Sequence, residues 1–160
     1  MFAFISSVLF FGTIPESMFY GLLTFMIFRF LTIVVLYRII DHNNLFPLII
    51  ATIPFLCVFL YLLSITEDQL GVSFYPALIN VFLVSFLGGI SLSNYILNDN
   101  KRNSLLLIST LICVTQNFLF IVQKFYFSNA IFQPITVIIY VASHYTFYKF
   151  LILDEEQKRV

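Results

Sequence analysis

Three kinds of polar side chain interrupt the longest apolar runs of this sequence, and each suits a different chemistry. Arg29, in the run FMIFRFLTI, carries a guanidinium, which binds phosphate or carboxylate oxygens through two parallel hydrogen bonds. Gln116 and Asn117, in ICVTQNFLF, carry amides, which hydrogen-bond but do not exchange protons at ordinary pH. His144 carries an imidazole, which can accept or release a proton near neutral pH. Together with Tyr140, these residues are the candidates for a ligand-binding site.

The elements that carry these residues are expected to be membrane-spanning helices. Hydrophobic residues make up 61% of the 160 residues, charged residues make up 10%, and the mean hydropathy is +1.00. Soluble domains are about 45–50% apolar, and a helix crosses a bilayer with roughly 20 apolar residues. A barrel would need segments of about 10 alternating residues, which do not occur. The predicted fold class is therefore all-α: a polytopic membrane helix bundle whose first partner is the lipid bilayer.

The apolar runs predict one transmembrane domain, residues 1–153, followed by a short charged tail, residues 154–160. A shorter apolar stretch, residues 2–14, precedes the full spans and lacks the basic start and the cleavage site of a signal peptide. It predicts either a short N-terminal helix or a chain that is truncated at Met1. The five full spans are expected at residues 17–40, 47–65, 73–97, 103–125 and 129–152.

The distribution of basic residues predicts the orientation, because Lys and Arg concentrate in cytoplasmic loops. When the connections are counted alternately, only Lys124 falls on one side, and the other side holds Arg38, Lys101, Arg102, Lys149, Lys158 and Arg159. The multi-pass chain is therefore expected to have a cytoplasmic C-terminus. The net charge is zero and gives no sign of a nucleic-acid partner.

Metal and cofactor chemistry is not indicated by the Cys and His residues. Cys57 and Cys113 lie inside apolar runs and are interpreted as small buried side chains. His42 and His144 are far apart and have no neighbouring Cys or acidic residue in the spans, so no metal site is predicted. No cofactor is predicted either, and the oligomeric state is left open.

Arg29 lies near the middle of its expected span, about 17 Å from either end at 1.5 Å per residue. A charge at that depth costs about 2.5–3.5 kcal/mol on insertion scales and marks a functional-site candidate. All eight acidic residues lie in expected loops, helix ends or the tail, so none supplies a carboxylate at mid-membrane. Two explanations stay open: protein oxygens satisfy a structural Arg29, or Arg29 binds an anion such as a lipid phosphate.

Two later spans carry polar side chains at helical spacing, and these two faces are expected to meet. The meeting faces would act either as structural hydrogen-bonding contacts or as the lining of a polar cavity that also includes Arg29. A third stripe, of small residues, predicts close helix packing within the chain. The first face consists of Ser109, Cys113, Gln116, Asn117 and Gln123, the second of Gln133, Thr136, Tyr140, His144 and Tyr148, and the small stripe of Ser85, Gly89 and Ser93.

Two segments of the chain resemble signatures of the YhhN family of lysoplasmalogenase-like membrane proteins. The C-terminal signature of the family is similar to the segment LICVTQNFLFIVQKFYFSNAIFQPITVIIYVASHYTFYKFLI. In this segment, Gln116 stands at the place of the Ser-Asp-Ser core and His144 at the place of the Gln-Tyr pair. The text YGLLTFMIFRFLTIVVLY is similar to a Gly-Leu-x-x-Phe-x-x-x-His segment, with Arg29 at the place of the His. The similarity covers most of the chain in the arrangement of its segments, but the residues themselves match the signatures poorly.

The resemblance implies a lysophospholipid ligand and hydrolysis of the vinyl-ether bond of lysoplasmalogen. That reaction needs a proton donor and a base, and the family is thought to use two intramembrane Asp residues. Gln116 and Ser7 stand at those positions here, so neither residue can supply the proton chemistry. The resemblance therefore predicts a lysophospholipid-binding protein with a degenerate catalytic site.

Two alternatives stay open beside this hypothesis. The chain could be an active lysoplasmalogenase that uses His144 as its acid or base. It could also be a small transporter or a structural membrane subunit, although no matched pair of interrupted helices is evident.

Overall fold

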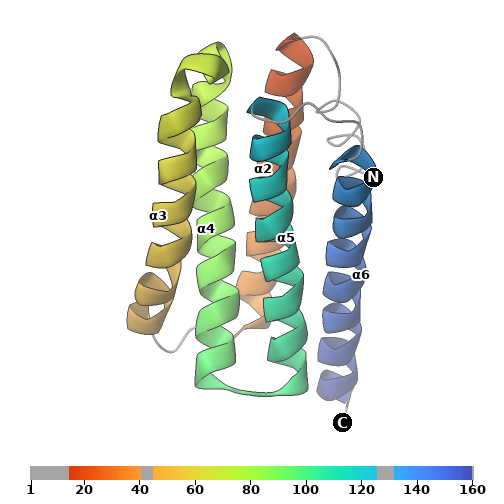
Figure 1. Ribbon diagram of the computed structural model, residues 1–160. Coiled ribbons are helices and arrows are strands. Elements are labelled where there is room, and N and C mark those ends of the chain that lie inside the picture. The colour runs from red at the N-terminus through yellow and green to blue at the C-terminus, as the bar shows by residue number, and fades with distance from the viewer. Residues whose placement is uncertain (1–14, 41–44, 126–131, 160) are drawn as a thin grey trace. The chain divides into compact units, whose positions relative to one another are not determined.

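The computed structural model describes residues 15–40, 45–125 and 132–159, and within these ranges the chain is almost entirely helical (Figure 1). The predicted all-α fold class is confirmed. The longer helices are α2 (Pro15–Ile39), α3 (Leu45–Leu70), α4 (Phe74–Leu97), α5 (Lys101–Phe125) and α6 (Phe132–Arg159), and a short 3-10 helix, η1 (Gly71–Ser73), lies between α3 and α4.

The expected count of five full spans is not matched. Within the described residues, four stretches are long and apolar enough to cross a membrane, which is the pattern of a multi-pass membrane protein. The second stretch runs through α3, η1 and α4 because the expected polar break near residue 66 is itself helical. The expected helix within residues 2–14 lies outside the described residues. The stretches are Phe19–Ile39, Phe46–Leu97, Lys101–Gln123 and Pro134–Glu156.

The chain divides into two compact units. The first consists of Met1–Asn43 and Pro54–Phe86, and the second of Asn44–Ile53 and Leu87–Val160. The boundary inside α3 falls at Pro54, which lacks the N–H that would bond the carbonyl one turn earlier.

In the first unit, α3 is followed by a tight turn into α4. Gly71 has a φ of +49°, a left-handed conformation that glycine adopts without strain and that commonly ends a helix. Beyond this turn, Pro76 occupies the first turn of α4, where its missing N–H has no helical partner to lose. The turn leads two apolar helices into one core, whose buried side chains include Phe59, Leu62, Leu63, Val81 and Val84.

In the second unit, two asparagines build the turn between α4 and α5. Asn100 is the N-cap of α5, and its Oδ1 accepts a 2.8 Å hydrogen bond from the backbone N–H of Asn103. The buried side chain of Asn103 donates in turn to the carbonyls of Asn94, at 3.2 Å, and Asn98, at 2.8 Å. Carbonyls at the end of α4 are thereby satisfied, which allows a three-residue connection between two long helices.

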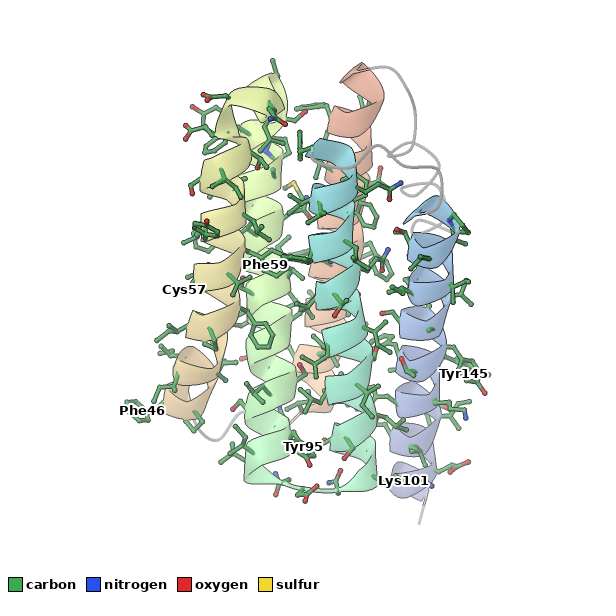
Figure 2. The ribbon with its side chains drawn as sticks, in the orientation of Figure 1. Phe46, Cys57, Phe59, Tyr95, Lys101 and Tyr145 are labelled. Atoms are coloured by element: carbon green, nitrogen blue, oxygen red, sulfur yellow. The ribbon has the colours of Figure 1, made fainter. Side chains whose placement is uncertain are left out.

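The outward face of α6 is apolar and aromatic, as expected for a face that meets lipid tails. Ile138 is 67% exposed and Val141 is 59% exposed. Figure 2 shows Tyr145 pointing away from α6, and the Lys149 ammonium lies 4.8 Å from the centre of its ring. Tyr145 lies at the middle of the apolar stretch Pro134–Glu156, and Lys149 lies one turn closer to its C-terminal end.

The stripe of small residues in α4 is buried, as its spacing predicted. At Gly89, an added Cβ would contact the Oγ1 of Thr52 in α3 and would lie 2.9 Å from the Cβ and 3.0 Å from the Cα of that residue. The backbones of the two helices therefore approach too closely here for any side chain. This contact lies within the second unit and confirms close packing inside the chain.

We expect Gly89→Ala to lower the free energy of unfolding in detergent by about 1–3 kcal/mol, because the added methyl group forces the two helices apart. Unfolding should be followed by far-UV circular dichroism in a mixed micelle. The same change in a Thr52→Ala background, which removes only Oγ1, should cost less but should still be unfavourable, because the Cβ and Cα of residue 52 remain close to the added methyl group. No loss of stability in either background would contradict the proposed contact.

Candidate functional site

The guanidinium of Arg29 lies inside the first unit and not against lipid. Arg29 is only 5% exposed, so its side chain faces the interior of this unit. Its Nη1 donates a 2.7 Å hydrogen bond to the side-chain Oδ1 of Asn80 and lies 3.4 Å from the backbone carbonyl of the same residue. Its Cζ is 5.5 Å from the centre of the Phe25 ring, one turn earlier in α2.

Asn80 has a fixed orientation because each end of its amide has its own partners. The Nδ2 group donates to the carbonyl of Leu22 in α2, at 3.0 Å, and to the carbonyl of Pro76 in α4, at 3.2 Å. The Oδ1 atom is then left to accept from Arg29. Asn80 was not among the predicted site residues, although it stands out as a lone amide within an apolar run of α4.

These contacts also show at which level along the helix axes the guanidinium lies. Because Asn80 bonds both Leu22 and Arg29, the guanidinium lies on the N-terminal side of its own Cα, the direction in which helical side chains lean. Asn80 is six positions after Phe74, so it lies about 9 Å from the start of α4. The charge is thus closer to a helix end than the position of Arg29 alone predicted.

The contact with Asn80 leaves the charge of Arg29 unchanged, because an amide is neutral. Of the two explanations considered for Arg29, protein oxygens are present in the structure, as an amide and a carbonyl. Hydrogen bonds from such groups offset part of the desolvation of a guanidinium. A bound anion stays a prediction.

The predicted meeting of two polar faces is confirmed within the second unit. Ser109 Oγ of α5 donates to the carbonyl of Ser143 in α6, at 3.0 Å, and Ser143 Oγ donates back to the carbonyl of Ser109, at 3.1 Å. Further along, the Thr136 hydroxyl donates to Gln123 Oε1, at 3.3 Å. Ser143 was not on either predicted face. Reciprocal bonds of this kind bring two helix backbones close together.

The predicted amides and imidazole lie along this same pair of helices. Gln116 and Asn117 fall between Ser109 and Gln123 in α5, and Tyr140 falls between Thr136 and Ser143 in α6. Gln116 is half-buried, and Asn117 Nδ2 donates to the carbonyl of Cys113, at 2.6 Å.

His144 is half-buried and is oriented by its own helix. Its Nδ1 lies 3.0 Å from the carbonyl of Tyr140, and the two rings are 4.2 Å apart. A carbonyl can only accept, so this contact places the proton on Nδ1 and leaves Nε2 as the acceptor in the neutral ring. Tyr148 is 59% exposed and lies off the inner face, contrary to prediction, while Ser7 and the side chain of Gln133 lie outside the described residues.

The candidate residues therefore fall into two groups. Arg29 belongs to the first unit, whereas Gln116, Asn117, Tyr140 and His144 belong to the second. The structure defines the surroundings of each group, and a hollow shared by both stays a prediction.

No family model, curated protein or solved structure matches this chain. The resemblance to the YhhN family accordingly stays a prediction.

A further polar contact, not predicted from sequence, closes the α5 and α6 pair near one end. Arg102 Nη2 and Asp154 Oδ1 form an ion pair at 2.7 Å, with the two side chains 18% and 5% exposed. The Arg102 guanidinium also lies 5.5 Å from the centre of the Phe150 ring, which is fully buried. Asp154 had been assigned to a charged tail, but α6 continues through it to Arg159.

We expect the Ser109 and Ser143 hydrogen bonds to act as one unit, because each hydroxyl bonds the backbone of the other residue. Ser109→Ala and Ser143→Ala should each lower the free energy of unfolding by about 0.6 kcal/mol, a typical value for such bonds in membranes. Unfolding of the single and double variants gives a double-mutant cycle. Ser64→Ala, at an exposed hydroxyl that bonds only its own helix, is the control. Loss from the control as large as from Ser109→Ala would contradict the interhelical role.

Proposed function

We propose that this protein binds a lysophospholipid inside the membrane, with Arg29 holding the phosphate, and that it does not hydrolyse the lipid. The observation that carries the proposal is the contact between Arg29 and Asn80. It holds a guanidinium that is buried inside the first unit in one orientation, and a charged group inside a membrane protein is a candidate for a functional site. A phosphate suits this cation because its oxygens accept two guanidinium hydrogen bonds at once.

The apolar surroundings favour a lipid as the source of that phosphate. The exposed faces of the described helices consist largely of Ile, Leu, Val, Phe and Tyr side chains, which meet acyl chains. A single-chain lipid can keep its tail among such side chains while its phosphate reaches a guanidinium about 9 Å from a helix end. The proposal is in line with the resemblance to the YhhN family, whose implied ligand is a lysophospholipid.

The proposed lack of hydrolysis follows from the groups at the implied catalytic positions. Gln116 is half-buried in α5 and carries an amide, which cannot donate and recover a proton during a reaction. We expect no aldehyde release from lysoplasmalogen by the purified protein above the rate of a protein-free blank.

The test is a titration of purified protein with lysophosphatidylcholine and with monoacylglycerol, which has the same tail and no phosphate. We expect the phosphate-bearing lipid to bind at least about tenfold more tightly, as a charge-assisted hydrogen bond contributes about 1.5–3 kcal/mol. Arg29→Gln should remove this preference, while Arg38→Gln, at an exposed position of the same helix, should keep it. Equal affinity of the wild type for both lipids would overturn the proposal.

A further inference from the structure

We infer that α3 and α4 form a two-helix hinge, at which the first unit bends relative to the second. Both helices pass from one unit to the other, α3 just before Pro54 and α4 just before Leu87. The remaining passage, between residues 43 and 44, lies outside the described residues. The bending does not depend on lipid binding. The hinge residues are Pro54 in α3 and Gly88, Gly89 and Ser91 in α4.

Pro54 weakens α3 at the boundary between the units. It has no N–H, so the carbonyl of Ile50, one turn earlier, loses its helical donor, and proline is one of the few causes of sharp helix kinks. Pro54 is exposed, so its ring does not fill the core of either unit. A bend at this position therefore breaks no helical hydrogen bond of Pro54 itself and leaves the packing around other side chains in place.

Glycine and serine weaken α4 close to its own passage between the units. Gly88 and Gly89 are adjacent in the helix, and glycine disfavours a helix interior by about 1 kcal/mol relative to alanine. The buried Ser91 hydroxyl donates to the carbonyls of Leu87 and Gly88, each at 3.0 Å. A serine that bonds back to its own helix competes with the backbone N–H groups for these carbonyls and favours bending.

The two weak points lie at the same level of the helix pair. An added Cβ on Gly89 would meet Thr52, so these two residues face each other. The short turn between α3 and α4 makes the helices run in opposite directions. Pro54 follows Thr52 by two residues and Leu87 precedes Gly89 by two, so both lie about 3 Å further along in the same direction. Because the weak points coincide, the two helices can bend together.

A small bend at this level produces a large displacement at the far end of α4. Tyr75 is 13 residues before Gly88, which is about 20 Å along a helix. A bend of about 20°, at which a helix kink counts as sharp, would displace Tyr75 by about 7 Å. The contact between Thr52 and Gly89 would persist, because both residues belong to the second unit. The separation of Arg29 and His144, which belong to different units, would vary with the bend.

Pulsed electron paramagnetic resonance on the full chain in lipid vesicles, without added ligand, tests the hinge. The native Cys57 and Cys113 are first replaced by alanine. Two pairs of spin labels are then compared, and both share a label at the exposed Ile138 of the second unit. The other label is at Tyr75, in the first unit, or at Ile96, in the second, and both of these α4 positions are exposed. We expect the distance distribution to be broader for the Tyr75 pair than for the Ile96 pair.

The variant Pro54→Ala with Ser91→Ala should narrow the Tyr75 distribution to the width of the Ile96 pair. It restores a backbone donor to α3 and removes the competing hydroxyl from α4. The matched control is Pro47→Ala with Ser64→Ala, both within α3 and away from the boundary, and it should leave both widths unchanged. Circular dichroism checks that each variant is folded.

Equal widths for the two pairs in the otherwise unchanged chain would overturn the hinge, and this comparison decides the matter even if the Pro54→Ala, Ser91→Ala variant does not fold. A Tyr75 distribution that stays broad in the folded variant would also overturn it, because the bend would then lie elsewhere. Since no ligand is added, a failure of lysophosphatidylcholine to bind would overturn the proposed function and leave the result on the hinge standing.

Discussion

Replacing Asp154 by alanine is expected to lower the free energy of unfolding by about 3–5 kcal/mol, the effect of removing one partner of a buried ion pair. Asp154 lies 2.7 Å from Arg102, and its side chain is 5% exposed. The variant leaves a guanidinium that is 18% exposed against the ring of Phe150 with its counter-ion removed. Equilibrium unfolding in mixed micelles measures the effect.

The position of Arg102 in its helix makes the loss larger. Arg102 is the second residue of α5, and the N-terminus of a helix carries a partial positive charge that disfavours a cation. Asp154, from the neighbouring helix, supplies a negative charge that offsets the guanidinium and the partial charge of the helix N-terminus. Without Asp154, these two positive charges lie close together.

Two further variants separate the ion pair from simple loss of a side chain. Glu155→Ala, at an exposed neighbouring carboxylate, should change stability by less than about 0.5 kcal/mol. The double variant Arg102→Met with Asp154→Leu should recover much of the loss, because well-packed apolar residues can replace a buried pair at little cost. A double variant as unstable as Asp154→Ala would show that packing and not charge is responsible.

The second large effect is expected at Arg29, and it has the opposite sign. Arg29→Leu should make membrane insertion of the α2 segment more favourable, by up to about 3 kcal/mol, because position 29 is near the middle of α2, where arginine opposes insertion and leucine favours it. The measurement is the fraction of full-length chains in which α2 is inserted, reported by glycosylation sites engineered on either side. The same change should abolish the preference for phosphate-bearing lipids.

Arg38→Leu is the matched control for depth, since Arg38 lies in the last turn of α2. Its effect on insertion should be much smaller, because charges near a helix end reach the membrane surface. Equal effects at the two positions would mean that Arg29 does not lie in the apolar interior. If Arg29→Leu improves insertion and also abolishes ligand binding, then Arg29 is needed for binding even though it makes the insertion of α2 less favourable.

The helices could be predicted from sequence because each is a long apolar run. The expected spans 73–97 and 103–125 differ from α4 and α5 by at most two residues at any end. The predicted span boundaries were wrong at residues 66–73, where polar residues suggested a wide break between two helices. Glu67 and Asp68 are exposed and continue α3, because a charged residue on the outer face of a helix end does not interrupt its hydrogen bonds.

The candidate site was predictable in its residues and less so in its contacts. Helical spacing identified Ser109, Gln123 and Thr136, which do meet across α5 and α6. It missed Asn80, which is a lone amide in an apolar run of α4, and it missed Ser143, which is seven residues after Thr136 but lies beside the predicted face that passes through His144. Pairing between helices depends on which faces turn toward one another, and periodicity within one helix does not determine that.

The central claim is that the Arg29 guanidinium holds a lipid phosphate, and a carbon–phosphorus dipolar coupling tests it most directly. Protein with ¹³C-labelled arginine would be saturated with lysophosphatidylcholine in a phosphate-free detergent, so that the ligand holds the only phosphorus. We expect solid-state NMR to show a coupling between phosphorus and an arginine Cζ that persists in Arg38→Lys and disappears in Arg29→Lys. No coupling in the saturated wild type, or a coupling that survives Arg29→Lys, would contradict the account.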